Sequence, residues 1–164
     1  TLKEELEFLK LYIEIVRIRF GDSIQFHWDI DEGLQDCNII KMCLQPIVEN
    51  AIQHGLRLKN YLGNITISAR CQDECLRICV ANDGENMTEK EMDTLNKTLK
   101  TGSGFEESKV GLRNVNERIK LVYGKEYGVS VNCDRVGTDP EERGSVQVVL
   151  SFPCRNLNRS EETK

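Results

Sequence analysis

The chain has 164 residues, of which 30% are charged, and a formal net charge of −5. This length allows one domain, or one domain with a docked element, and a core of its own. No basic cluster points to nucleic acid, no apolar run reaches the roughly 20 residues of a membrane span, and no signal peptide is visible. Because the first residue is Thr1 and not Met, we expect a fragment of a longer protein.

The seven cysteines are odd in number and form no CxxC pair. Three of them, Cys71, Cys75 and Cys79, are four residues apart, but they fall in strand-like sequence, where this spacing does not build a ligand cluster. We interpret all seven as reduced, mostly buried cysteines of a reducing compartment, in preference to a metal site.

The sequence predicts a first helix over residues 2–20 that carries two apolar stripes. The stripes are Leu2, Leu6, Leu9, Ile13, Val16 and Phe20, and Phe8, Leu11, Ile15 and Ile18. One stripe suffices to dock a helix on a domain, so two stripes predict contacts on two sides, as in a helical hairpin or a dimer seam. Gly21 and Asp22 are expected to end the helix.

The next elements alternate between the strand period and the helix period. Residues 24–30 alternate as a half-buried strand, and residues 63–71 and 76–80 predict a β-hairpin. A helix is expected between the strand at 24–30 and this hairpin. It begins near Gln45, or near Ile39 with a kink at Pro46, because proline is tolerated in a first turn but not in a helix interior.

The second half of the chain predicts two helices and a second hairpin. Thr88 and Glu91 form a capping box that starts a short helix, and a Gly/Ser-rich stretch follows at 100–109. A further helix runs from just after Gly111 to Gly124. The remaining expected segments are a strand at 129–133, a polar turn at 134–144, a strand at 146–152 and a polar tail at 155–164. This order predicts an α/β fold, a two-layer α/β sandwich with one mixed sheet and helices on one face.

The segment Leu44 to Gly55, LQPIVENAIQHG, is a candidate site because it sets polar residues on an apolar helix. Asn50 and His54 are spaced i and i+4, so they share one face. An amide oxygen held in this way suits Mg²⁺, which takes oxygen ligands beside substrate phosphates. On its own, the segment is better explained as a core helix with a polar edge, because amphipathic helices are the normal case in globular proteins.

Two further segments carry the same kind of ambiguity. In the run from Asn82 to Met87, NDGENM, a glycine at a strand end lets the backbone approach a flat ligand, and an Asn or Asp oxygen can accept a hydrogen bond from an exocyclic amine. The same letters also form a common turn. In the run from Val110 to Val115, VGLRNV, a glycine opens a helix with free amides, which is an anion cradle or simply a helix start.

Taken in this order, the three segments resemble the N, G1 and G2 boxes of the Bergerat-fold (GHKL) ATP-binding domain, specifically of the LytS/YesM type of sensor histidine kinase. The opening LKEELEFLKLYIEIVRIRFGD resembles the second helix of that family's phosphoacceptor hairpin, and GLRNVNERIKLVYG resembles its G2 box and following helix. The likeness covers residues 2–153. It implies a hairpin helix at 1–21, an ATP-binding kinase domain at 22–154 and a tail at 155–164.

The resemblance implies a nucleotide site with Asn50 as the Mg²⁺ ligand and with Gln53 and His54 near the phosphates or the nucleotide edge. It also implies a lid at roughly residues 88–109. The nucleotide-binding residues implied are Asn50, Gln53, His54, Asn82, Asp83, Gly84, Met87, Lys109, Gly111, Leu112, Arg113, Asn114 and Ser145.

The chain departs from the family pattern at several of these positions. Asn82 stands where an Asp usually holds the adenine amino group, and Asp83 replaces it if the turn shifts by one residue. Asn86 and Lys109 stand where glycines are usual, with Gly104 a possible source of the missing flexibility. Gly144-Ser145 stands where a Gly-Thr pair usually closes the adenine site.

The reaction expected from the resemblance is phosphoryl transfer to a histidine. Several relatives place a Glu four residues before the metal Asn, but here that position is Pro46, and Glu49 points about 100° away around the helix. A base for ATP hydrolysis or serine phosphorylation is therefore lacking. Neither His27 nor His54 has a helical acceptor context, so we expect the phosphoacceptor outside this chain.

The implied ligands and partners are ATP, Mg²⁺, the phosphoacceptor helix of the parent kinase and a response regulator, with no nucleic acid. The implied parent is a homodimer that is anchored in a membrane, with this domain in the cytoplasm. Two alternatives stay open at this point: a Bergerat-type ATPase, and a degenerate non-catalytic module for nucleotide binding or dimerisation.

Overall fold

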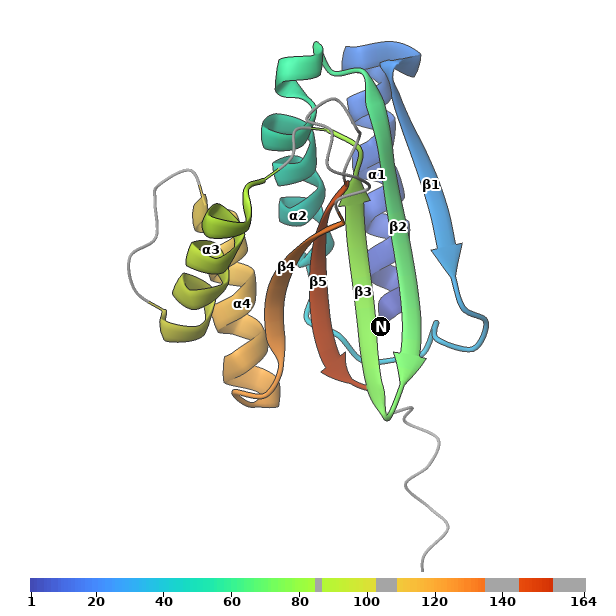
Figure 1. Ribbon diagram of the computed structural model, residues 1–164. Helices are drawn as coiled ribbons and strands as arrows, with labels where there is room; N and C mark the ends of the chain where they lie inside the picture. Colours follow the sequence, from blue (N-terminus) through green and yellow to red (C-terminus); the bar gives the residue numbers. More distant parts are fainter. Residues whose placement is uncertain (85–86, 103–108, 135–144, 155–164) are drawn as a thin grey trace, which may run out of the picture.

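The computed structural model describes residues 1–84, 87–102, 109–134 and 145–154. Its strands are β1 (Ile24–Ile30), β2 (Gly63–Gln72), β3 (Cys75–Asn82), β4 (Gly128–Asp134) and β5 (Ser145–Pro153). Its α-helices are α1 (Leu2–Phe20), α2 (Leu44–Asn50), α3 (Glu89–Thr101) and α4 (Val110–Tyr123). Short 3₁₀ turns are η1 (Gly21–Ser23) and η3 (Arg57–Lys59), and η2 (Ala51–Gly55) is a π-helical segment that continues α2 (Figure 1).

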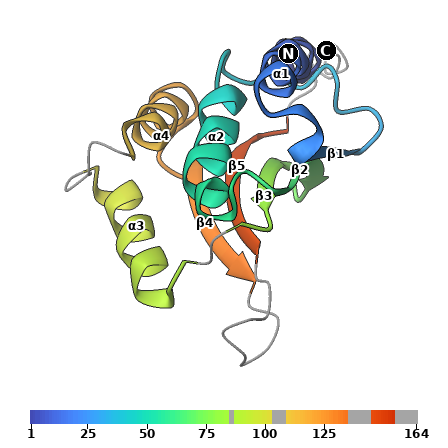
Figure 2. The ribbon, with the colours of Figure 1, turned by 90° about the horizontal axis from the view of Figure 1, so that it is seen from above.

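The strands form one mixed sheet in the order β1-β2-β3-β5-β4. The β1–β2 pair is parallel and the other pairs are antiparallel. Figure 2 shows the four α-helices on one face of this sheet. Alternate residues of β3, ending at Val80 and Asn82, are buried against the helices. The predicted fold class, a two-layer sandwich with a mixed sheet, is confirmed.

Helix α1 buries one of its two apolar stripes, whereas the second contact that the sequence predicts is not formed within the described residues. Leu9, Ile13 and Val16 are buried in the shared core. The second stripe faces solvent, with exposed fractions of 49% for Phe8, 66% for Leu11, 64% for Ile15 and 87% for Ile18. No helix in the described ranges has both the length and the apolar character needed to cross a membrane.

A buried carboxylate on α1 holds the start of α2. Glu5 is only 6% exposed, and its carboxylate accepts hydrogen bonds from the backbone N–H groups of Met42 (2.7 Å), Cys43 (2.7 Å) and Leu44 (2.9 Å). A negative charge at a helix N-terminus is favourable, because the first N–H groups have no partner within the helix. The helix begins at Leu44, which agrees with the expected start near Gln45 and places Pro46 in the first turn.

The expected turns and caps also form. Asp73 and Glu74 have φ of 52° and 57° and make the two-residue turn of the β2–β3 hairpin. The capping box closes with Glu91 N–H donating to Thr88 Oγ1 (3.3 Å) and Thr88 N–H donating to Glu91 Oε2 (2.9 Å). Helix α4 starts earlier than expected, so Gly111 lies within its first turn. The expectations for Asn86, Gly104, Gly144 and the tail at 155–164 lie outside the described residues.

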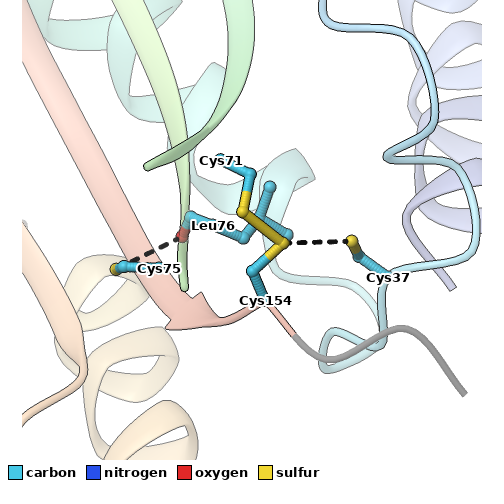
Figure 3. Close-up of a disulfide and its surroundings, with 5 residues drawn as sticks. All are labelled: Cys37, Cys71, Cys75, Leu76 and Cys154. Atoms are coloured by element: carbon cyan, nitrogen blue, oxygen red, sulfur yellow. Dashed lines mark hydrogen bonds between the residues drawn. A yellow bond between two sulfur atoms is a disulfide. The ribbon is translucent and has the colours of Figure 1, made fainter. Parts of the chain in front are cut away.

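The interpretation of the cysteines as reduced and mostly buried is wrong. Cys71 and Cys154 form a disulfide, and the Sγ of Cys37 lies 3.8 Å from that of Cys154 (Figure 3). The strands β2 and β5 both pair with β3, which brings their ends together although they are 83 residues apart in sequence. Of the five cysteines outside the disulfide, Cys37 and Cys43 are buried and the others are partly exposed.

Candidate functional site

A cavity of about 480 Å³ lies between the end of α2, the end of β3, helix α3 and the start of α4. Its lining joins segments that are far apart in the sequence. The lining residues are Asn50, Ala51, His54, Gly55, Asn82, Met87, Thr88, Glu91, Leu95, Lys109, Leu112, Val131, Val146 and Val148. The three sequence segments that suggested a site therefore meet at one place.

The sheet side of the cavity is apolar. Val131 of β4 is paired with Val148 of β5, and Val146 of β5 is paired with Asn82 of β3. Leu95 of α3 completes this surface. Clefts with mostly apolar walls and a few polar groups are typical of small-molecule sites. The apolar wall with Asn82 at its edge suits a flat ring that carries polar edge atoms.

Two side-chain amides at this cavity have a buried nitrogen without a hydrogen-bond partner. Among the described residues, the buried side-chain nitrogen and oxygen atoms without a partner are Asn50 Nδ2 and Asn82 Nδ2, and both residues line the cavity. Leaving a buried polar group unsatisfied costs about 1–3 kcal/mol, so such groups call for an explanation. A ligand that bonds both amides supplies one.

A larger cavity of about 920 Å³, near the C-terminal ends of α3 and α4, lacks this feature. Its buried amide, Asn116, is satisfied within the fold. The Nδ2 of Asn116 donates to the carbonyl oxygen of Leu99 (2.8 Å), and its Oδ1 accepts from the N–H of Val129 (2.9 Å). The two amide nitrogens without partners therefore favour the smaller cavity as the functional site.

Two glycines hold Asn82 against the end of the π-helical segment. A Cβ atom on Gly55 would lie 2.3 Å from Asn82 Nδ2, and a Cβ atom on Gly84 would lie 1.9 Å from the carbonyl oxygen of Gly55. A side chain at either position would push apart the end of η2 and the turn after β3. Asn82 is consequently packed to 5% exposure at a fixed position in the cavity wall.

The other amide, Asn50, lies beside the first turn of α4. A Cβ atom on Gly111 would be 3.5 Å from Asn50 Nδ2 and 3.5 Å from the Cβ of Pro46, which is ordinary contact. The N-cap residue of α4, Lys109, lines the same cavity. The first turn of a helix has N–H groups without helical partners and attracts anions. This end of the cavity thus combines an amide, a helix start and a lysine.

His54 lines the cavity, whereas Gln53, on the same segment, does not. Both side chains are exposed. They lie in the π-helical η2, which replaces the regular α-helical spacing that the sequence predicted for Asn50 and His54. A π-helical turn in a helix is often found at functional sites.

Six other residues expected at the nucleotide lie outside the cavity lining: Gly84 and Gly111, whose contacts are given above, and Asp83, Ser145, Arg113 and Asn114. The carboxylate of Asp83 accepts from the backbone N–H and the Nδ2 of Asn64, each at 2.7 Å, so Asn82 and not Asp83 faces the cavity. Ser145 lies on the other side of the sheet with Asp83. Arg113 forms an exposed ion pair with Glu117 at 2.8 Å, and Asn114 is exposed.

Sequence reasoning did not assign the capping box or the valine wall to the site. Thr88 and Glu91 line the cavity as well as starting α3. Hydrogen bonds from Thr88 hold the pKa of the Glu91 carboxyl below its usual range, and Lys109 acts in the same direction. The strand alternation indicated that Val146 and Val148 share a face, but nothing local showed which ligand would lie there.

The family model described as "Histidine kinase-, DNA gyrase B-, and HSP90-like ATPase" matches residues 35–156. The chain belongs to this ATPase family. Its resemblance to the catalytic domains of YesM- and LytS-type sensor histidine kinases is also confirmed. The chain is 33% identical over 156 residues to sensor histidine kinase YesM of Bacillus subtilis and 38% identical over 139 residues to sensor histidine kinase YpdA of Escherichia coli.

These matches cover 95% and 84% of this chain but 24% and 23% of the two relatives, so the chain spans about a quarter of their length. Solved structures agree on the fold. The catalytic domain of histidine kinase ThkA has a TM-score of 0.60 at 19% identity, covering 93% of this chain and 91% of that one. The mycobacterial sensor histidine kinase MprB has a TM-score of 0.53 at 15% identity, covering 90% of this chain and 96% of that one.

Proposed function

We propose that this histidine kinase catalytic domain binds ATP with Mg²⁺ in the 480 Å³ cavity and presents the γ-phosphate to a histidine outside residues 1–164. The observation that carries the proposal is that the two buried amide nitrogens without a partner, Asn50 Nδ2 and Asn82 Nδ2, belong to residues that line one cavity. An ATPase-family fold with two such groups in one cleft is organised for a ligand with polar atoms at both ends.

In this proposal the two ends of the cavity divide the nucleotide between them. The purine lies on the valine wall, where Asn82 reads its polar edge. The phosphates lie toward Asn50, with Lys109 and the first turn of α4 supplying positive charge and N–H donors. His54, at the cavity wall, is in reach of the nucleotide, while Gln53 and Arg113 act at most on parts of ATP outside the cavity.

The residues present fit Mg²⁺ that arrives with the nucleotide. The described part of the chain holds no cluster of three or more His, Cys, Asp or Glu side chains able to bind a metal by itself. Mg²⁺ keeps several waters and is commonly bound by one or two protein groups together with substrate phosphates. Asn50 would hold it through its amide oxygen, since the amide can turn to present either atom. The bound ion neutralises phosphate charge.

The carboxylates near the cavity are poorly suited to act as a general base. Pro46 stands one turn before Asn50, and Glu49 accepts a hydrogen bond from Gln45 (2.8 Å) on α2. Glu91 is engaged by Thr88, which lowers its pKa. A neutral imidazole already carries a free lone pair, so it can attack phosphorus without a base, and phosphoryl transfer depends mainly on positioning. This favours a kinase over an ATP hydrolase.

The proposed kinase function also implies partners. Histidine kinase ThkA has been solved in complex with response regulator protein TrrA, and we propose that the parent of this chain likewise passes the phosphoryl group to a response regulator. Residues 1–21 would belong to the phosphoacceptor hairpin, 22–154 to the kinase domain and 155–164 to a tail. The exposed stripe of α1 would then face the parent's homodimer seam. The parent would be membrane-anchored, with this domain in the cytoplasm.

Calorimetric titration of Mg-ATP into the chain tests the proposal. We expect saturable one-site binding, and the absence of binding at millimolar nucleotide would overturn it in favour of a non-catalytic module.

Incubation with γ-labelled ATP tests whether the phosphoacceptor histidine lies outside this chain. We expect no stable phosphohistidine in the isolated chain, whereas labelling of His27 or His54 would contradict that expectation. Steady ATP turnover would favour the ATPase alternative.

A further inference from the structure

We propose that Asn82 makes base recognition permissive, so that the cavity binds 6-oxopurine nucleoside triphosphates about as well as ATP. This inference rests on the proposed function and goes beyond it by assigning the substrate class. Asn82 is 5% exposed, its Nδ2 has no partner among the residues that the structure describes, and it lines the cavity.

The position of Asn82 assigns it to the base and not to the phosphates. As the last residue of β3 it is paired with Val146, whose side chain belongs to the apolar wall. The start of α4, where Lys109 is the N-cap residue, lies instead beside Asn50, since a Cβ atom on Gly111 would be 3.5 Å from Asn50 Nδ2. The flat apolar part of a nucleotide fits the wall, so the polar edge of the purine is the part that meets Asn82.

An amide and a carboxylate read the 6-position of a purine differently. A carboxylate only accepts hydrogen bonds, so it pairs with the 6-amino group of adenine and repels a 6-oxo group. An amide offers one acceptor and two donors. Its oxygen and nitrogen can pair with the amino group and N1 of adenine. Rotated by 180°, the nitrogen and oxygen can pair with O6 and N1–H of hypoxanthine.

The surroundings of Asn82 allow both orientations. The oxygen and nitrogen of an amide are nearly equal in size, so rotation changes no packing volume against Gly55 and Gly84. The neighbouring carboxylate, Asp83, is held by Asn64 on the other side of the sheet. Glu91 lies at α3, bonded to Thr88. Neither carboxylate is therefore placed to repel O6 at the position of Asn82.

The test is a pair of calorimetric titrations with Mg-ATP and Mg-ITP, which differ only at position 6 and the N1 proton. For the native chain we expect the two dissociation constants to agree within about threefold. In the matched variant Asn82→Asp, the carboxylate should raise the ratio of the ITP constant to the ATP constant by about tenfold or more, because buried unpaired polar groups discriminate strongly. Glu7→Ala, on the exposed side of α1 and away from the cavity, should leave the ratio unchanged.

A preference of the native chain for ATP above about tenfold would overturn the inference while leaving the proposed function intact. An unchanged ratio in Asn82→Asp would also overturn it, provided that its thermal melt shows a folded protein. If Asn82→Asp does not fold, the ratio in the native chain decides alone. Failure to bind either nucleotide would overturn the proposed function and this inference with it.

Discussion

A Cβ atom on Gly84 would lie 1.9 Å from the carbonyl oxygen of Gly55. The turn after β3 and the end of η2 therefore cross with their backbones in direct contact, and Asn82 is held at that crossing. The two glycines belong to separate sequence segments, each of which is ambiguous alone. Their contact explains why both segments contribute to one cavity.

Replacing Gly84 by alanine should therefore destabilise the protein. We expect a loss of about 1–3 kcal/mol in the free energy of unfolding, the usual cost of forcing extra atoms into a packed site, and weaker nucleotide binding. The matched control is Gly111→Ala, whose Cβ would meet only ordinary contacts at 3.5 Å. In a helix this change should be neutral or stabilising by up to about 1 kcal/mol. If urea unfolding gave equal stabilities for the two variants, the close backbone contact between Gly84 and Gly55 would be contradicted.

Glu5→Ala should weaken the attachment of α1 to α2. The substitution leaves the N–H groups of Met42, Cys43 and Leu44 without their acceptor, and we expect a loss of about 1–3 kcal/mol in the free energy of unfolding. Glu7→Ala, on the exposed side of α1, should change it by less than about 0.5 kcal/mol. If denaturant unfolding gave the same result for both variants, Glu5 would not act as the cap of α2.

The disulfide should contribute measurably to stability under oxidising conditions. Because Cys71 and Cys154 are 83 residues apart, reduction or Cys71→Ser should cost about 2–4 kcal/mol by enlarging the unfolded ensemble. Cys133→Ser, which leaves the disulfide intact, should cost less. Calorimetric melts with and without reductant give the comparison. A melting temperature that does not change on reduction would contradict a stabilising disulfide.

In Cys71→Ser, Cys154 should re-pair slowly with Cys37, whose Sγ lies 3.8 Å from that of Cys154. Burial raises the pKa of the Cys37 thiol, so little of the reactive thiolate is present at neutral pH. Peptide mapping after mild oxidation should show the Cys37–Cys154 linkage increasing as the pH is raised. A yield that is independent of pH would argue against control by the Cys37 thiol.

Acidification should loosen the start of α3. Hydrogen bonds from Thr88 lower the pKa of Glu91 in the folded state. The stabilisation is therefore complete above the ordinary glutamate range and is lost as the pH falls through the lowered folded pKa. Amide exchange of the first turn of α3 should speed up in this acid window. Glu91→Gln keeps a capping-box acceptor and should abolish the pH dependence. An equal acid effect in Glu91→Gln would assign it to other groups.

Elements governed by local patterns were predictable from the sequence. The alternation in 63–71 and 76–80, the Thr88–Glu91 capping box and the buried stripe of α1 appear as expected, because each depends on neighbours in the sequence. The predicted contact of the second stripe of α1 stays a prediction. The alternation along β3 also indicates on which side of the sheet Asp83 lies. Val80 and Asn82 share the buried face of β3, so Asp83 has to point to the other side.

Features that depend on distant neighbours were not predictable in this way. The disulfide joins the ends of two strands that meet only through β3. No proline or glycine between Asn50 and Gly55 indicates that the chain becomes π-helical in η2. The engagement of Asp83 by Asn64 requires β2 and β3 to be paired first. Sequence reasoning located the site but not all of its walls.

In the proposed site, Asn50 couples Mg²⁺ to nucleotide binding. The most direct measurement is calorimetric titration of ATP with Mg²⁺ and with chelator, in the native chain and in Asn50→Ala. We predict that Mg²⁺ tightens ATP binding to the native chain by about tenfold or more, or ~1.4 kcal/mol, that Asn50→Ala loses most of this gain, and that Mg²⁺ alone does not bind. An equal Mg²⁺ effect in both proteins would show that Asn50 does not hold the ion.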